Sequence, residues 1–372
     1  MRSLPLAMVS AALAVSACSA EATDDVGEAT AADTSAALEP RFFDPGVVDD
    51  AVFRHGNPDP ATVDVATVEK IIADAETTGS DSVIVAVGDT IVAEKYFGHD
   101  GAPATIQSVS KSVTSLVIGA LVAERKIPSV DAPLSRFYPE WSEGTKALVT
   151  VRHVVSMTSG VSDWQSDMFS HADTLAYARE RPLLWEPGTT FAYTNAGSML
   201  LAGVALQAGG APLDVLARER FFGPLGITQW SWSKDGAGNV AAQGGLFMRP
   251  RDLLLLGRLM RDRGAWNGRQ LLPSVWVDSV GVPNAVSPCY GLEWWVLRDG
   301  CDPSRAPAPD AVLGPLEGYF ADGYGGQYIT IVPRSNIVGV RTKKPLPTGT
   351  PLPELQKANY AEFPHQVGKL GR

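Results

Sequence analysis

The residues that favour β-strands lie toward the two ends of the chain, and a long helix-rich stretch separates them. Two β-branched runs flank Gly88-Asp89, a dipeptide typical of hairpin turns. Three more strand-like runs lie near the C-terminus, at 290–297, 327–333 and 336–342. Between the ends, apolar residues recur at helical spacing. We therefore predict an α+β fold in which one sheet is assembled from both ends, around a mostly helical insertion.

The chain has 372 residues, 45% of them hydrophobic, which is enough for a large buried core. The predicted helices lie at 61–79, 108–122, 150–157, 171–181, 195–208, 212–222, 249–263 and 273–280. The predicted boundaries are a signal peptide at 1–17, a flexible linker at 18–40, a sheet domain made of 41–135 and 286–372, and a helical domain at 136–285. We expect a cleft where the last two meet.

The N-terminal residues are typical of an exported protein. One arginine, an apolar run of about a dozen residues and then small residues form a secretory signal that is too short to cross a membrane. Val15-Ser16-Ala17-Cys18 resembles a bacterial lipobox, which implies that Cys18 carries lipid and tethers the domain. We therefore expect a cell-envelope protein that faces the periplasm or the exterior and touches the membrane only through this anchor. The alternative is a plain signal peptide with an incidental Cys18.

The charge and the scattered histidines exclude several classes of partner. The net charge is −10 and no Lys/Arg-rich block is present, so we expect no nucleic-acid partner. No dinucleotide glycine fingerprint, Walker loop or His-x-x-x-His pair occurs, so no metal or other cofactor is expected. The expected partner is a small-molecule substrate, and the sequence leaves the oligomeric state open. His153 lies inside a predicted helix, and we interpret it as structural.

The stretch SVSKSVTSLVIGALV begins with a serine and a lysine and then becomes almost wholly apolar. At i and i+3 of a helix, Ser108 and Lys111 share one face. A serine hydroxyl is a weak nucleophile until a base removes its proton, and a lysine is a base only when it is uncharged. An apolar helix and its N-terminal dipole both disfavour the ammonium form. We therefore predict that Ser108 is a nucleophile and Lys111 its proton acceptor.

A lone Ser-x-x-Lys match is weak evidence, and the chain holds a second copy at Ser231–Lys234. That copy is followed by DGAGN, which favours turns, and no apolar helix continues from it. We therefore interpret it as a surface turn.

Two further segments carry polar groups suited to the same chemistry. Tyr193 and Asn195 precede an apolar helical run, where a phenol can relay a proton and an amide can bind a lysine or a substrate carbonyl. The alternative is that Asn195 caps the helix and Tyr193 is core. In GYFADGYGGQYITIVP, Gly323 and Gly325 allow close backbone approach, so that N–H groups can bind an oxyanion. A β-bulge or a tight hairpin is the alternative there.

Beyond Cys18, the chain has only Cys289 and Cys301. Export would permit a disulfide between them, which would close a loop around YGLEWWVLRDG. Two reduced or separate cysteines are the alternative, since spacing alone does not set the geometry.

Taken in order, the three motifs resemble those of serine hydrolases with the penicillin-recognising fold. These are class C β-lactamases, D-alanyl-D-alanine carboxypeptidases, family VIII carboxylesterases and 6-aminohexanoate-dimer hydrolases. GGLFMRPRDLLLLGRLM, GAWNGRQLLPSVWVDS and GYGGQYITIVP look most like the last branch. The resemblance implies an antiparallel sheet flanked by helices.

The same resemblance implies a role for each site residue. Ser108 would be the acylated nucleophile, Lys111 its base partner and Tyr193 the proton relay, with Asn195 as an accessory. The N–H of Ser108 and one from the third motif, most plausibly that of Tyr324, would form the oxyanion hole. Which of Lys111 and Tyr193 is the general base stays open.

The third motif departs from the β-lactamase pattern. That pattern has Lys-Thr-Gly on this strand, whereas this chain has Gly-Tyr-Gly and no lysine in 318–333. Without that cation, β-lactams and D-Ala-D-Ala ends lose an anchor for their carboxylate. We therefore predict an exported serine hydrolase that cleaves an ester or amide bond. The alternatives are a β-lactamase or D-alanyl-D-alanine carboxypeptidase, or a non-catalytic penicillin-binding receptor.

Overall fold

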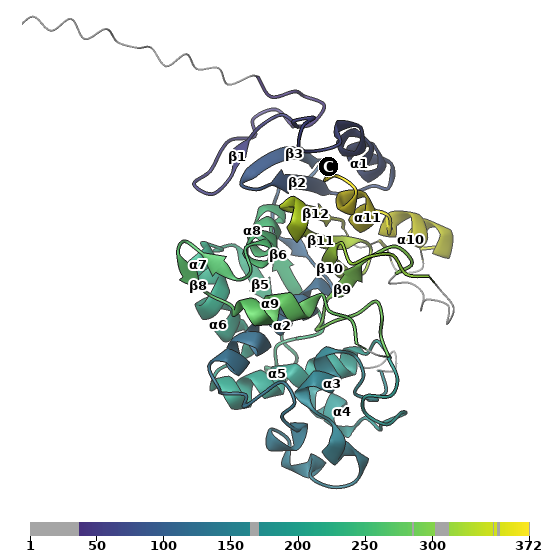
Figure 1. The fold of residues 1–372 in the computed structure, drawn as a ribbon. Coiled ribbons are helices and arrows are strands. Elements are labelled where there is room, and N and C mark those ends of the chain that lie inside the picture. The colour runs from purple at the N-terminus through teal and green to yellow at the C-terminus, as the bar shows by residue number, and fades with distance from the viewer. Residues whose placement is uncertain are drawn as a thin grey trace, which may run out of the picture. The chain divides into compact units, whose positions relative to one another are not determined.

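The structure, a computed structural model, describes residues 37–163, 171–284, 286–301, 312–344, 346–347 and 350–371 (Figure 1). The signal peptide, Cys18 and most of the predicted linker lie outside the described residues.

One seven-stranded sheet combines the two ends of the chain, as predicted. Its order is β1-β3-β2-β12-β11-β10-β9, and all neighbouring pairs are antiparallel except β1 and β3. Figure 1 shows β2 and β3 beside β12, which comes from the far end of the chain. The strands are β1 (Arg54–His55), β2 (Ser82–Val87), β3 (Thr90–Tyr96), β9 (Trp295–Leu297), β10 (Gly318–Gly323), β11 (Gln327–Val332) and β12 (Ile337–Thr342).

The helices largely follow the predicted spacing. They are α1 (Val65–Thr77), α2 (Val109–Ala123), α3 (Val151–Val155), α4 (Thr174–Glu180), α5 (Asn195–Gly209), α6 (Leu213–Ala217), α7 (Gly223–Leu225), α8 (Pro250–Arg261), α9 (Ser274–Val280), α10 (Leu352–Asn359) and α11 (Phe363–Gly368). The two C-terminal helices were not predicted. A smaller sheet pairs β4 (Ala104–Thr105), β6 (Leu246–Met248) and β5 (Trp230–Trp232), and β7 (Ala265–Trp266) pairs with β8 (Arg269–Gln270).

The predicted strand at 290–297 is wrong over its first half, because only Trp295–Leu297 pairs with the sheet. Glu293 has a φ of 59°, in the left-handed region, which an extended strand does not contain.

Helix α2 is enclosed on all sides because nearly its whole surface is apolar or small. Thirteen of its residues are buried, Lys111 among them. The helix packs against α5 and α6 on one side and against β10 and β11 on the other. The start of α2, with Ser108 just before the helix and Lys111 in its first turn, therefore lies between the helical part and the sheet.

Helix α8 packs on β11 and β12 although its sequence lies within the predicted helical insertion. Gly257 faces β12 so closely that a Cβ there would lie 2.4 Å from Val338 Cγ1 and 3.1 Å from Ile329 Cγ2. The small residue thus lets the helix backbone approach the sheet.

Among the described residues, no single helix has both the length and the apolarity that a membrane span requires. Within the described part of the chain, α5 and the segment Leu213–Leu225 meet both requirements only when they are taken together, and this pair is bent by 70°.

Gly257→Ala tests the close contact between α8 and the sheet. Helix propensity alone predicts that this change stabilises the protein by about 0.5–1 kcal/mol. Because the new Cβ would overlap Val338, we expect instead a loss of about 1–3 kcal/mol in the free energy of unfolding, measured by urea denaturation. A gain in stability would contradict the packing described here.

Candidate active site

The amine of Lys111 lies at the centre of a small hydrogen-bond cluster. Its Nζ is 3.0 Å from Ser108 Oγ, 2.7 Å from Asn195 Oδ1 and 2.7 Å from the backbone oxygen of Gln243. The side chain is 1% exposed. The first two partners are residues predicted from the sequence, and the structure brings them together.

The partners of Lys111 differ in what they can donate. A backbone carbonyl only accepts, and Asn195 presents its oxygen because its Nδ2 faces Asp163, a carboxylate, at 3.4 Å. Ser108 alone can either donate or accept. An uncharged amine can donate its two N–H groups to Asn195 and Gln243, which leaves its lone pair directed at the Ser108 hydroxyl. The arrangement therefore suits proton transfer from Ser108 to Lys111.

Burial favours the uncharged form of the Lys111 amine. It lowers the pKa of Lys111 to about 8, although the carboxylates of Glu293, Asp163 and Asp322 act in the opposite direction.

Ser108 precedes α2 in a tight turn. It is half-buried, and its φ and ψ of −69° and −7° lead directly into the helix. Gln107 before it has a φ of 50°, in the left-handed region, which is uncommon for a residue with a side chain. The Ser110 hydroxyl donates to the Gln107 carbonyl at 2.6 Å and helps to hold this turn. The turn thus places the hydroxyl at the end of the helix with positive polarity.

Tyr193 lies beside both members of the pair. The Lys111 Nζ is 4.9 Å from its ring centroid, and its phenol interacts with the Ser108 side chain. Burial raises the pKa of its phenol well above the ordinary value. The phenol is therefore suited to carry a proton while remaining neutral.

Helix α5 begins at Asn195, but its N-cap is Thr194, whose hydroxyl accepts from the Gly197 N–H at 3.1 Å. The alternative that Asn195 caps this helix is thus not what the structure shows. Asp163 instead anchors Asn195, because its Oδ1 accepts from the Asn195 N–H at 2.7 Å.

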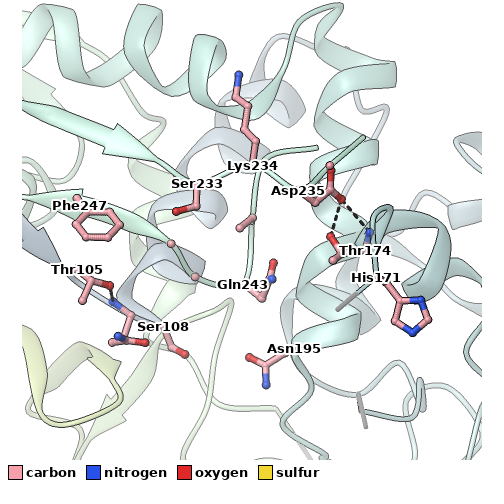
Figure 2. A pocket seen from close by; sticks show the side chains of 15 residues that line it. Thr105, Ser108, His171, Thr174, Asn195, Ser233, Lys234, Asp235, Gln243 and Phe247 are labelled. Carbon is pink, nitrogen blue, oxygen red and sulfur yellow. Dashed lines mark hydrogen bonds between the residues drawn. The ribbon is translucent and has the colours of Figure 1, made fainter. Parts of the chain in front are cut away.

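A cavity of about 600 Å³ opens in front of Ser108 (Figure 2). Its lining combines α4, α5 and the small sheet, and comprises Thr105, Gln107, Ser108, His171, Thr174, Asn195, Ser233, Lys234, Asp235, Gly236, Ala241, Gln243, Gly244, Gly245 and Phe247. Figure 2 shows Gln243 and Asn195 within this space. Gln243 is buried, with only 5% of its surface exposed. Its side-chain Oε1 has no hydrogen-bond partner among the described residues.

The second Ser-x-x-Lys copy lies on the wall of this cavity. Ser231 is exposed, as predicted, but it lies on strand β5 and not in a surface turn, so that part of the prediction is wrong. Lys234 extends away from Gln243 in Figure 2 and forms an ion pair with Asp214 at 2.8 Å. Its amine is thus committed elsewhere and does not serve a serine.

The third motif forms the tight hairpin between β10 and β11, which was the alternative interpretation of its glycines. Gly323 lies close to the segment before Ser108, since a Cβ there would lie 2.4 Å from the Ile106 carbonyl oxygen. The Gly325 N–H donates to Asn359 Oδ1 at 3.1 Å and so points away from an oxyanion. Tyr324 is 56% exposed, and its N–H donates to no described residue. Its oxyanion role stays a prediction.

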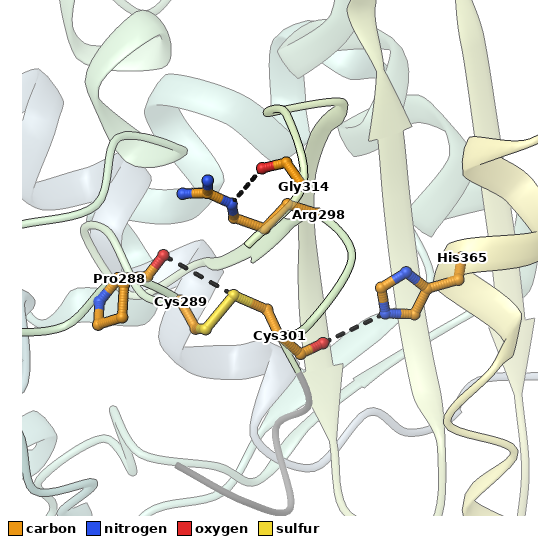
Figure 3. The surroundings of a disulfide bond; sticks show 6 residues. All are labelled: Pro288, Cys289, Arg298, Cys301, Gly314 and His365. Carbon is orange, nitrogen blue, oxygen red and sulfur yellow. Dashed lines mark hydrogen bonds between the residues drawn. A yellow bond between two sulfur atoms is a disulfide. The ribbon is translucent and has the colours of Figure 1, made fainter. Parts of the chain in front are cut away.

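Cys289 and Cys301 form a disulfide, with Cα atoms 5.4 Å apart (Figure 3). The loop that this bond closes carries Tyr290 and Trp295, and these two residues together with Tyr193 form the aromatic wall of the site. The rings of Tyr193 and Trp295 stack with centroids 6.0 Å apart, and Tyr290 meets both edge-on, at 6.3 Å and 4.8 Å. The disulfide thus restrains the residues that pack against Tyr193.

His153 is structural, as predicted. It pairs with Thr150 in a capping box at the start of α3. Among the described residues, no group of three or more His, Cys, Asp or Glu could hold a metal ion.

The family model described as Beta-lactamase matches residues 68–354. The chain belongs to the beta-lactamase family. The 6-aminohexanoate-dimer hydrolase of Paenarthrobacter ureafaciens is 27% identical over 55% of this chain and 58% of its own length. Esterase EstB of Burkholderia gladioli is 28% identical over 33% of this chain and 36% of its own length. The matches thus span about half or less of these relatives.

Solved structures share the fold of this family member. A candidate 6-aminohexanoate-dimer hydrolase from Bacillus anthracis aligns with a TM-score of 0.65 at 20% identity, over 86% of this chain and 87% of its own. A penicillin binding protein from Bacillus halodurans aligns with a TM-score of 0.59 at 18% identity, over 77% and 97%. The predicted beta-lactamase/transpeptidase-like fold is confirmed.

Four residues of this beta-lactamase family site were not predicted from the sequence: Asp163, Gln243, Glu293 and Trp295. Gln243 holds Lys111 through its backbone, which no residue type reveals. Trp295 is one of two adjacent tryptophans that belong to no motif, and Asp163 lies just after VRHVVSMTSGVS without a motif of its own. Glu293, an acid between apolar residues in YGLEWW, was the one visible signal.

Removing the disulfide tests whether it restrains the aromatic wall of this family member. For the double variant Cys289→Ser/Cys301→Ser, loop-closure entropy predicts a loss of about 3 kcal/mol in the free energy of unfolding, measured by chemical denaturation. Dithiothreitol should destabilise the wild type and leave the double variant unchanged. Equal stability of the oxidised wild type and the double variant would contradict this role.

Proposed function

We propose that this protein is an exported serine hydrolase that cleaves an ester or amide bond through an acyl-enzyme on Ser108. One observation carries the proposal: the buried Lys111 amine is 3.0 Å from the Ser108 hydroxyl while two pure acceptors bind its N–H groups. A buried amine is costly, and it is best explained by the chemistry it performs.

In the proposed first step, Ser108 Oγ attacks the substrate carbonyl carbon and Lys111 takes the hydroxyl proton. The carbonyl π electrons move to its oxygen, which becomes the oxyanion. When the oxyanion collapses, the bond to the leaving alcohol or amine breaks, and Tyr193 delivers a proton to it, regaining one from Lys111. Water then attacks the acyl-enzyme by the same route, releases the acid and restores Ser108.

The oxyanion is proposed to bind the N–H groups of Ser108 and Tyr324. Neither donates a hydrogen bond to any residue that the structure describes. The contact of Gly323 with Ile106 supports the proximity of the two segments. Donors that are fixed before the reaction stabilise the developing charge without reorganisation.

The cavity favours substrates without an obligatory carboxylate. Two lysines of the described residues that could replace the missing cation are placed elsewhere. Lys234, on the cavity lining, pairs with Asp214 at 2.8 Å, and the amine of Lys343 lies 3.4 Å from where a Cβ of Gly79 would be. The names of the matched relatives, a dimer hydrolase and an esterase, fit ester or amide substrates. A β-lactamase, a D-alanyl-D-alanine carboxypeptidase or a penicillin-binding receptor is the alternative, which nitrocefin turnover as fast as ester turnover would favour.

Export and lipid anchoring at Cys18 form part of the proposal. They rest on the apolar N-terminal run and on the sequence VSAC. A hydrophobic tether would hold the domain at the membrane surface of the cell envelope.

Ser108→Ala tests the nucleophile. A protein starting at residue 37 should hydrolyse p-nitrophenyl butyrate and gain one fluorophosphonate adduct by intact mass. Because Ser108 lies beside the Lys111 amine whereas Lys234 is paired with Asp214, both results should disappear in Ser108→Ala and persist in Ser231→Ala, the matched Ser-x-x-Lys copy. An adduct that maps to any other residue would contradict the assignment.

Gln243→Leu tests the orphaned amide in the cavity. Its backbone still holds Lys111, so the variant removes only the side-chain hydrogen-bonding group. We expect kcat/KM for an N-acyl-amino-acid p-nitrophenyl ester, which carries an N–H, to fall about tenfold, as for one lost buried hydrogen bond. Turnover of the matched acyl ester without N–H should stay within about twofold. An equal loss for both substrates would exclude a role in recognition.

A further inference from the structure

Glu293 is an unusual residue for its place in the fold. It is 2% exposed and has a φ of 59°. A non-glycine residue in this region stores backbone strain, and a buried carboxylate is expensive to desolvate. Neither property helps the loop to fold, so their coincidence at one residue beside a reactive site suggests a role there.

Four contacts hold Glu293 between the helices of the site. Its carboxylate accepts from the Ser198 hydroxyl of α5 and from the Tyr290 hydroxyl, both at 2.8 Å. Its N–H donates to the Val155 carbonyl at the end of α3, and its carbonyl accepts from the Ser112 hydroxyl at 2.7 Å. Ser112 follows Lys111 on α2, and Ser198 is three residues after Asn195 on α5. The residue thus links the two helices that present the hydrogen-bond cluster.

No lysine, arginine or histidine of the described residues forms an ion pair with this carboxylate. The cation that acts on it through space is Lys111. Asp163 and Asp322 act on the same amine, and the phenols of Tyr193 and Tyr290 complete the titratable groups around it. Burial raises the pKa of Glu293 to about 7, so its charge changes in the range where Lys111 also titrates.

We propose that Glu293 is a positioning residue whose buried negative charge sets the pH range in which Lys111 is an uncharged base. The proposal rests on the proposed function of Ser108 and Lys111. An anionic Glu293 favours the ammonium form of Lys111 and so opposes the effect of burial. The same carboxylate holds Tyr290, whose ring packs against Tyr193. The Glu293 side chain therefore acts on both the charge of Lys111 and the packing of Tyr193.

The pH dependence of Ser108 labelling by a fluorophosphonate tests this proposal. The rate should rise with pH as Lys111 loses its proton, with a midpoint near its pKa of about 8 in the wild type. Glu293→Gln removes the charge and preserves the shape, so the amine loses its proton more readily. We expect the midpoint to move to lower pH by about one unit, and the difference in rate to appear above about pH 7, because below that pH the wild-type Glu293 is itself protonated and uncharged.

Two further variants separate charge from structure. Glu317→Gln is the matched control, because Glu317 is not among the charges that act on Lys111, and its midpoint should equal that of the wild type. Ser198→Ala keeps Glu293 but removes a hydrogen bond that favours its anionic form. The midpoint should then move in the same direction by a smaller amount. This variant decides the question if Glu293→Gln does not fold.

The outcomes distinguish the two levels of the proposal. A folded Glu293→Gln whose midpoint stays at the wild-type pH, or moves higher, overturns the role of Glu293 even when its plateau rate falls. The proposed function survives that result as long as Ser108 is labelled. If Ser108 in the wild type is not labelled at any pH, the proposed function itself fails.

Discussion

The hydrogen bonds of the Lys111 amine are the interaction on which the rest of the site depends. They join α2, the start of α5 and the segment before β6, which are distant in sequence. A buried amine without acceptors would be strongly destabilising, so these segments are held together by the need to satisfy it. Asn195 Oδ1 and the Gln243 carbonyl can only accept hydrogen bonds. An uncharged Lys111 amine therefore donates its two N–H groups to them and keeps its lone pair for the Ser108 hydroxyl. One set of bonds thus serves both the fold and the chemistry.

The fold produces this arrangement because α2 cannot face water. Its surface is apolar or small nearly all round, so the sheet and the helices must enclose it, and the residues just before it, Gln107 and Ser108, line the cavity. The loop closed by the disulfide then brings Tyr290 and Trp295 against Tyr193. Burial lowers the pKa of Lys111 and the nearby carboxylates raise it, so the balance between them, rather than burial alone, fixes when the base is uncharged.

Much of the fold and part of the site could be predicted from sequence. Ser108 and Lys111 share one helical turn, so their proximity is a local property that spacing reveals. The association of the two chain ends in one sheet followed from the order of strands and helices. The backbone oxygen of Gln243 could not be predicted, because every residue has one and only tertiary packing selects it. The short β9 was missed for a related reason: tertiary contacts hold Glu293 at a φ that no strand pattern anticipates.

The most direct measurement of the central claim is an NMR titration of the protein with its lysine side chains labelled at ¹³Cε and ¹⁵Nζ. The Lys111 signal is assigned by its loss in Lys111→Arg. The account predicts that this signal titrates with a midpoint near 8, well below about 10.4, the ordinary value for a lysine in a model peptide. A Lys111 signal that titrates together with the other lysines would contradict the account, since the amine would then be an ammonium ion at neutral pH and could not accept the Ser108 proton.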